Sequence, residues 1–502
     1  MPEWKPLLPD RELDRLRQAL DGYTVDGVHE LIGLEGQASL GRGDLNGVAR
    51  CLRSVDDRVA TLVRLFLLGA EVSEAAARAA LHPLSLDSAG ASGLLACSAG
   101  AACARIDVRP YAEASAATGD APWWVISDFG SDVRTGPLAA DHVLGVGSAS
   151  LTLAQATPRA QVGRVLDVGT GCGVQALHAA RHSAHVCATD TSARALRFAA
   201  TTAALSGQRW QLRQGSLLDP VAGERFDLVV ANPPFVVSGG TRTHDYRDSG
   251  LAGDGVCRAL ITGLPDVLAD SGTAVLLANW IIPRDGDWQA RLQQWLAGTG
   301  CDAWVWQREV ADPGQYVAMW LRDAGEQPGT SRWAERYDAW RDVLDAAGVA
   351  ALGMGLVALW RTDAATPVRV LEDVPQAIEQ PIGAALPAWI LRQRRLAACS
   401  DEQLLRTALR PAAGVVRTRD EVLGPQGWRS DADRLRQTSG MRWEVEVDDA
   451  IAALVAGLDG SVSLLAPLSV LAGAFDRSVD ELAAAALPVV RDLVGRGFLE
   501  WP

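Results

Sequence analysis

Two short segments of the chain combine residue types and spacings that suit chemistry on a bound ligand. The first reads VLDVGTGCGV and contains Asp167 and the alternating glycines Gly169, Gly171 and Gly173. It follows an apolar run typical of a strand and opens the apolar pattern of a helix over 174–181. Glycine lets the backbone turn sharply beneath a ligand, and a helix N-terminus offers unpaired N–H groups. We therefore expect this turn to hold a ligand at the end of a strand.

The spacing of the glycines selects among possible ligands. The dinucleotide fingerprint needs glycine at the first, third and sixth positions, but the sixth position counted from Gly169 is Val174. The chain has Gly-x-Gly-x-Gly instead, with an acid two residues upstream. Asp190 ends the next expected strand, where an acid accepts hydrogen bonds from both ribose hydroxyls of an adenosine cofactor; the alternative is that it caps a helix. We expect Thr170 and Thr191 to contact the same cofactor.

The second segment, VVANPPF, ends the fourth expected strand of the same region. Its two prolines lack backbone donors and stiffen the turn, and the residue before each is pushed to an extended conformation. Asn232 is thereby expected to aim its side-chain oxygen into a cleft, beside the Pro233 carbonyl. These acceptors suit the two N–H donors of a planar amino group and would orient its lone pair for in-line attack. Phe235, after Pro234, offers a face on which a flat substrate can stack.

Together these segments resemble motif I and the Asn/Asp-Pro-Pro-Tyr/Phe motif of class I S-adenosylmethionine-dependent methyltransferases that modify nitrogen. Release-factor glutamine, ribosomal RNA guanine-N2 and adenine-N6 methyltransferases share this pair, and the resemblance covers roughly residues 140–361. It implies S-adenosyl-L-methionine as the cofactor. It assigns substrate binding and catalysis to Asn232, Pro233, Pro234 and Phe235.

The resemblance also implies a set of cofactor contacts. Many of these enzymes have an acid where this chain has Ser216, so we expect Leu217 to pack on the adenine ring face instead. Just upstream of the first strand, the segment 145–150 either covers the methionine end of the cofactor or simply begins a helix. The full implied set is Asp167, Gly169, Thr170, Gly171, Gly173, Asp190, Thr191, Ser216, Leu217 and Asn232.

The elements that must position these residues follow from the alternation of short apolar runs and helical patterns after Arg164. This rhythm predicts a Rossmann-like, doubly wound α/β domain with a parallel sheet and helices on both faces. Ligands then bind at the carboxyl ends of the strands. Two late strands are expected over 303–309 and 355–361, and between them Asp312-Pro313 begins an inserted pair of helices.

We expect three domains. Residues 1–135 read as a mainly helical domain with a small hairpin, 136–365 as the methyltransferase domain, and 366–502 as an α+β domain. The last ends in a helix, a second helix that starts at the capping box of Ser478 and Glu481, and a strand. Both flanking domains are compatible with winged-helix-like modules.

Composition limits the partners and the setting. The net charge of −14 excludes a protein that is basic all over, but residues 392–442 contain 11 arginines against 6 acids. This stretch is either a phosphate-contacting surface or a solvated face of paired charges. The eight cysteines include no CxxC pair, so we expect no metal site. The N-terminus lacks a signal pattern and no long apolar run occurs, which favours a cytoplasmic protein without membrane contact.

Three functions stay open from the sequence. The first is an N-methyltransferase acting on a macromolecule, either a nucleic acid base or a protein glutamine amide. The second is a small-molecule N-methyltransferase of a biosynthetic pathway, and the third is a non-catalytic protein that binds S-adenosylmethionine. The polar segment 239–250 after the Asn-Pro-Pro-Phe motif is either a substrate lid or a solvated loop.

Overall fold

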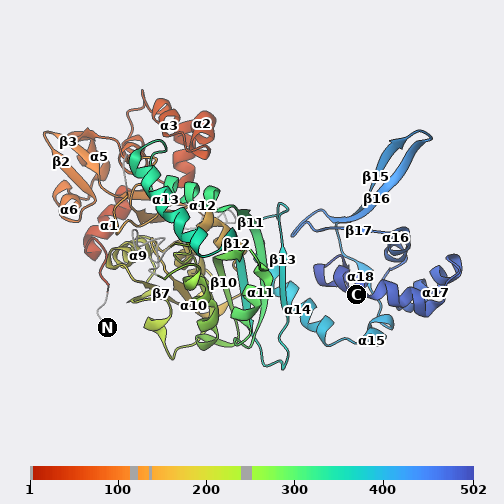
Figure 1. Cartoon of the computed structure of the whole chain (residues 1–502). Helices are drawn as coiled ribbons and strands as arrows, with labels where there is room; N and C mark the ends of the chain where they lie inside the picture. Colours follow the sequence, from red (N-terminus) through yellow and green to blue (C-terminus); the bar gives the residue numbers. More distant parts are fainter. Residues whose placement is uncertain (1–3, 113–121, 135–137, 239–250) are drawn as a thin grey trace. The chain divides into compact units, whose positions relative to one another are not determined.

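The computed structural model describes residues 4–112, 122–134, 138–238 and 251–502. Contacts divide the chain into two compact units (Figure 1). Unit 1 comprises residues 1–154, 160–364 and 371–373, and unit 2 comprises residues 155–159, 365–370 and 374–502.

Unit 1 is built on an eight-stranded sheet with the order β13-β11-β12-β10-β9-β6-β7-β8. The chain forms β6, β7 and β8 on one side and then returns to add β9 beside β6 and β10 beside β9, so the strand order reverses between β6 and β9. Such a switch point is where open α/β sheets bind ligands. The strands are β6 Val162–Val168, β7 Ser183–Asp190, β8 Gln211–Gln214, β9 Phe226–Ala231, β10 Leu268–Pro283, β11 Cys301–Ala311, β12 Val349–Arg361 and β13 Arg369–Asp373.

The directions of the strands correct one expectation. The five adjacent strands β8, β7, β6, β9 and β10 are parallel to one another, as predicted. In contrast, β12 is antiparallel to both β10 and β11, so the sheet is mixed. A buried strand reads as an apolar run in either direction, and the inserted helices let the chain re-enter the sheet with opposite polarity.

Helices cover both faces of this sheet, as the Rossmann-like prediction requires. On one face α8 (Val174–Ala180) and α9 (Ala193–Leu205) contribute to a core that includes Leu177 and Phe198. On the other face α10 (Gly255–Gly263) and α11 (Trp288–Leu296) pack with strand residues in a second core. Between β11 and β12 lie the expected inserted helices, α12 (Pro313–Asp323) and α13 (Ser331–Ala346). The Asp312 carboxylate caps α12 by accepting from the N–H groups of Gly314 and Gln315, at 2.8 and 3.0 Å.

The N-terminal part of unit 1 is mainly helical, with the predicted helices near 10–20 and 56–68 and a hairpin of β4 and β5. It packs directly on α9: the Thr201 hydroxyl accepts from the Leu7 N–H at 2.9 Å, and the Thr202 hydroxyl from the Ile126 N–H at 3.1 Å. Its elements are α1 Asp10–Ala19, α2 Val25–Gly41, α3 Leu45–Cys51, α4 Arg58–Leu62, η1 Val63–Leu67, β1 Val72–Ser73, α5 Glu74–Leu81, α6 Leu86–Ala91, β2 Leu95–Ser98, β3 Ala101–Ala104, β4 Asp107–Tyr111 and β5 Trp123–Ser127. Helix α7 (Ser148–Ala156) leads into the central sheet.

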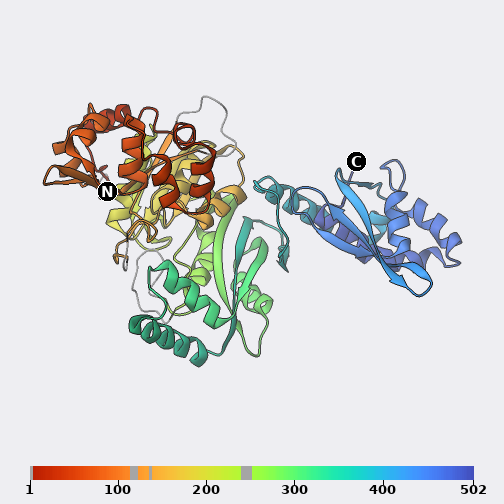
Figure 2. The same ribbon diagram turned by 90° about the horizontal axis from the view of Figure 1, so that it is seen from above.

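Unit 2 contains helices and strands, in agreement with the α+β prediction, and its long β15–β16 hairpin stands out in Figure 2. The final helix, helix and strand occur as expected, and the Ser478–Glu481 capping box is present. No helix in the described ranges is long and apolar enough to cross a membrane. The elements of unit 2 are α14 Ala385–Ala397, α15 Asp401–Leu405, β14 Arg410–Pro411, β15 Val415–Gly424, β16 Gly427–Gln437, β17 Glu444–Val447, α16 Asp449–Ala456, α17 Leu465–Ala474, α18 Val479–Arg496 and β18 Leu499–Glu500.

Candidate active site

The glycine-rich turn joins β6 to α8 in a conformation that requires glycine. Gly169, Gly171 and Gly173 have φ angles of +72°, +52° and +87°, in the left-handed region that side chains disfavour. A Cβ at Gly173 would lie 2.7 Å from a ring carbon of Trp210, so close packing also excludes a side chain there. The Thr189 carbonyl accepts from the N–H groups of Gly169 and Thr170, both at 2.9 Å, which anchors the turn to β7.

Asp190 ties this turn to the start of α9. One of its carboxylate oxygens accepts from the Gly171 N–H at 2.9 Å, and the other accepts from the Ser192 N–H at 2.8 Å. The side-chain N-cap of α9 is Ser192, which accepts from Ala195 N–H. Each carboxylate oxygen can accept more than one hydrogen bond, so Asp190 keeps acceptor capacity toward the cavity that it lines.

Asp167 lies beneath the turn rather than in the cavity. It is 1% exposed and accepts from the Thr170 hydroxyl at 2.6 Å and from the Ala176 N–H at 3.2 Å. Burial raises the pKa of this carboxyl to about 7. Its geometry suits support of the turn and the first residues of α8.

Asn232 follows β9 and reaches the same cavity. Its amide nitrogen donates to the Ser150 hydroxyl at 3.3 Å. The Ser150 carbonyl in turn accepts from the Gln175 amide at 2.7 Å. Asn232 is thus held by α7, and α7 is held by α8. The side-chain oxygen of Asn232 is the atom that can accept from a substrate, and the hydrogen bond from the amide nitrogen to Ser150 orients the side chain. Pro233 and Pro234 line the cavity beside it.

Phe235 follows Pro234 and is not among the residues that line this cavity. Its ring meets Trp320 of α12 edge-on, with 6.0 Å between the ring centroids, and its stacking on a flat substrate stays a prediction. The inserted helices supply this partner, and nothing in the local sequence around Phe235 indicates it.

The cavity has a volume of about 420 Å³ and brings together most of the predicted residues. Sequence reasoning missed His142, Val143 and Gln175, which also line it. The upstream segment that we singled out does contribute, through Gly145 and Ser150. The polar segment 239–250 lies outside the described residues. The predicted residues in the lining are Gly169, Thr170, Gly171, Asp190, Thr191, Ser216, Leu217, Asn232, Pro233 and Pro234.

The shape of the cavity fits the cofactor that the motif implies. A Cβ at Gly171 would meet no other part of the chain within 4 Å, so open space lies against the bare backbone of the turn. Leu217 sits at φ +48°, an unusual conformation for leucine that tends to occur at functional sites. It lines the cavity and packs on the core beneath, as expected for a residue under an adenine ring.

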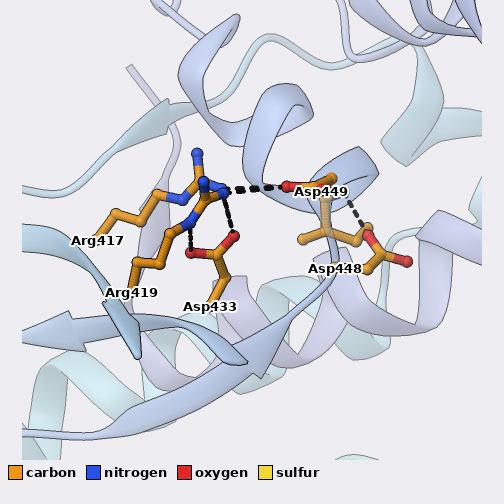
Figure 3. A network of polar contacts seen from close by, with 6 residues as sticks. Arg417, Arg419, Asp433, Asp448 and Asp449 are labelled. Carbon is orange, nitrogen blue, oxygen red and sulfur yellow. Dashed lines mark hydrogen bonds and ion pairs between the residues drawn. The ribbon is translucent and has the colours of Figure 1, made fainter. Parts of the chain in front are cut away.

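In unit 2, the structure favours the paired-charge interpretation of the arginine-rich stretch. Arg419 forms a two-pronged ion pair with Asp433, at 3.0 and 2.7 Å, and Arg417 binds the same carboxylate (Figure 3). Both arginines also lie 3.3 Å from Asp449. Further pairs join Arg434 to Asp420, Arg406 to Glu402 and Arg410 to Glu500.

The fold and the lining of this cavity agree with the predicted methyltransferase domain. Residues 143–283 match the family model described as "Methyltransferase small domain", which confirms the predicted class, an S-adenosylmethionine-dependent methyltransferase. The flanks match two models described as domains of unknown function, DUF7059 over residues 21–125 and DUF7782 over residues 387–501.

Two relatives match the central part of the chain. The chain is 39% identical over 129 residues to a release factor glutamine methyltransferase of Xylella fastidiosa, which is 23% of this chain and 47% of the relative. It is 32% identical over 182 residues to ribosomal RNA small subunit methyltransferase C of Escherichia coli, which is 36% of this chain and 48% of the relative. The chain thus spans less than half the length of these relatives.

Proposed function

We propose that the chain transfers a methyl group from S-adenosyl-L-methionine to a planar amino or amide nitrogen of a macromolecule, either a nucleic acid base or a protein glutamine. The observation that carries this proposal is that Asn232 opens into the cavity that the glycine turn and Asp190 line. The relatives with matching central domains are named for glutamine and ribosomal RNA, which supports a nitrogen on a macromolecule over a small molecule.

The residues of the chain have separable tasks in this reaction. Asp190 would hold the ribose, the turn would lie against the methionine part, and Leu217 would support the adenine. When bound, S-adenosylmethionine supplies the electrophilic methyl group. The Asn232 oxygen and the Pro233 carbonyl would accept the two N–H groups of the substrate nitrogen, and the rate gain comes from this orientation and from fixed dipoles facing developing positive charge.

Proton removal needs no dedicated base in this scheme. The nitrogen becomes positively charged as the methyl group arrives, and it then loses a proton readily to water. Hydrogen bonds from its N–H groups to Asn232 and Pro233 strengthen as that charge develops. The asparagine is therefore expected to act on the rate of transfer more than on cofactor affinity.

Our proposal for the organisation of the chain keeps three functional parts, 1–135, 136–365 and 366–502. The separate family matches over residues 21–125, 143–283 and 387–501 support this division. The flanking parts would select the macromolecule, while the central part carries the chemistry.

The test is the Asn232→Ala variant. We expect methyl transfer from labelled cofactor into the protein and RNA fractions of a host extract to fall on the order of 100-fold. Cofactor affinity, measured by calorimetry, is expected to stay at the wild-type value. Asn46→Ala, an exposed asparagine in α3, is the matched control and should transfer normally. Equal activity of Asn232→Ala and the wild type would rule out the proposed role of the motif.

A further inference from the structure

A second cavity in unit 1, of about 560 Å³, is lined by four arginines and, among the residues that the structure describes, by no acidic residue. Arg105 lies between β3 and β4, and Arg134 lies after β5. Arg194 and Arg197 stand one turn apart on α9. Three separate segments of the chain thus bring cations to one hollow, in a protein whose net charge is −14.

The cations of this cavity are only partly neutralised. Arg194 forms a two-pronged ion pair with Asp128, at 2.5 and 3.1 Å. Arg134 donates to the Ala104 carbonyl and lies over the Phe129 ring, contacts that orient the guanidinium without cancelling its charge. Arg105 and Arg197 are exposed, and among the residues that the structure describes neither has an ion-pair partner.

Such an arrangement favours an anion. Guanidinium groups of like charge that line one cavity attract a negatively charged ligand, most strongly at low salt. The arginine-rich stretch of unit 2 illustrates the contrasting case, because there the guanidinium groups face carboxylates across the hairpin. The cavity of unit 1 is therefore suited to a ligand that brings several negative charges.

The arginine cavity and the cofactor cavity share one helix. Ser192 and Ala195 of the first turns of α9 line the cofactor cavity, whereas Arg194, Arg197 and Phe198 line the arginine cavity. At 100° per residue these two sets lie on different sides of a helix about 10 Å in diameter. A ligand at the arginines is thus separate from the cofactor. A polymeric substrate that enters the active site could still contact both cavities.

Asp128 joins the two cavities. Besides its pair with Arg194, its carboxylate accepts from the N–H of Val143 at 2.9 Å, and Val143 lines the cofactor cavity. The Asp128 carboxylate therefore positions one residue of each cavity, Arg194 and Val143.

We propose that this arginine cavity binds the phosphate backbone of a nucleic acid substrate, an inference that rests on the proposed N-methyltransferase function and selects nucleic acid over protein glutamine. Guanidinium groups match phosphate oxygens in a fixed fork geometry. A polynucleotide is the macromolecule that carries evenly repeated phosphates beside the base to be methylated, and backbone contacts of this kind position a strand without reading its sequence.

The first test measures binding of a fluorescein-labelled single-stranded RNA to the full chain by anisotropy over a range of salt concentrations. The triple variant Arg105→Ala, Arg134→Ala, Arg197→Ala leaves the Asp128–Arg194 pair intact. We expect it to bind at least about tenfold more weakly at low salt, and its salt slope to fall by about 2, since each single-strand phosphate contact contributes about 0.7. The matched control is Arg225→Ala. Arg225 is exposed and directly precedes β9, at the end of the strand away from Asn232, so this variant should bind like the wild type.

The outcomes separate this inference from the proposed function. Cofactor affinity of the triple variant should be unchanged, which also shows that it folds. RNA binding lost in the triple variant supports the cavity even if no methyl transfer is found. Equal RNA binding by the triple variant and the wild type would overturn the proposal that this cavity binds RNA. The same holds if the wild-type protein methylates a protein fraction and does not bind RNA.

A second measurement needs no variant. Cys103 lines the arginine cavity, whereas Cys97, on the neighbouring strand, is exposed and does not line it. Bound RNA should slow alkylation of Cys103 and leave alkylation of Cys97 unchanged, as read by peptide mass spectrometry. Equal rates at Cys103 with and without RNA contradict the proposal.

Discussion

Two aspartates flank the glycine turn, and their surroundings give them different tasks. Asp190 lines the cavity and keeps acceptor capacity toward a ligand, while Asp167 is buried beneath the turn. The sequence placed both acids in the cofactor site because both stand at the carboxyl ends of strands. It did not reveal their depth, because Asp167 is closed off by the Thr170 hydroxyl only once the turn has folded over it.

The buried aspartate predicts an unusual pH dependence of stability. Burial raises the pKa of Asp167 from 3.8 to about 7, so between these pH values the folded state holds a proton that the unfolded chain releases. Stability from this group is therefore complete at low pH and is lost as the pH rises toward 7. Asp167→Asn cannot ionise, so the melting temperature of the wild type minus that of the variant should decrease from pH 4.5 to pH 7. An increase of this signed difference over the same range contradicts the account.

At the scale of elements, the inserted helices were predictable but their task was not. Asp312-Pro313 marks the start of α12 in the sequence, whereas the contacts of Tyr316 join residues far apart along the chain. Its buried hydroxyl accepts from the Val237 N–H and from the Asn279 amide, both at 2.9 Å. Trp340 of α13 donates to the Val237 carbonyl at 3.0 Å. The insertion thus fastens the segment that follows Asn-Pro-Pro-Phe.

Removing the Tyr316 hydroxyl should loosen this segment. Tyr316→Phe leaves two buried donors unpaired, a loss of about 1–3 kcal/mol in stability for each. We expect the rate constant of methyl transfer to fall more than cofactor affinity, measured in single-turnover and calorimetric experiments. Tyr337→Phe, a half-buried tyrosine of α13, is the control and should change neither. A variant of Tyr316 with normal transfer would show that the fastening is not needed.

The sheet shows the same limit of local patterns. The apolar runs of β6, β7, β9 and β10 were recognisable in sequence, and they place the cofactor turn and the asparagine motif at neighbouring strand ends. The reversed direction of β12 was not recognisable in sequence, because the hydrophobic pattern of a buried strand is the same in either direction.

At the scale of the whole molecule, the N-terminal part shares one core with helices α8 and α9. Helix α8 is buried at each of six consecutive positions, which indicates partners on more than one side. On the outer side Leu177 packs in a core with residues from α1 and β5. The sequence predicted this helix, but Gln175 and His178 stand three residues apart in it and resemble a polar face. The identity of its partner depended on long-range packing.

The two compact units predict two unfolding transitions in a calorimetric scan of the full chain. The cofactor cavity lies within unit 1, so S-adenosylmethionine should raise the temperature of one transition only. At a concentration about 100 times the dissociation constant, the stabilisation should be about 2.7 kcal/mol. A single transition that moves as a whole, or two that move together, contradicts the assignment of the cofactor to unit 1.

The most direct test of the central claim is the position of the transferred methyl group. Wild-type protein is incubated with isotopically labelled S-adenosylmethionine and host RNA and protein, and the products are digested to nucleosides and amino acids for mass spectrometry. The account predicts label on an exocyclic base nitrogen or on a glutamine amide nitrogen, and its absence with Asn232→Ala. Label on carbon, oxygen or sulfur, produced by the wild type at the same cavity, would contradict it.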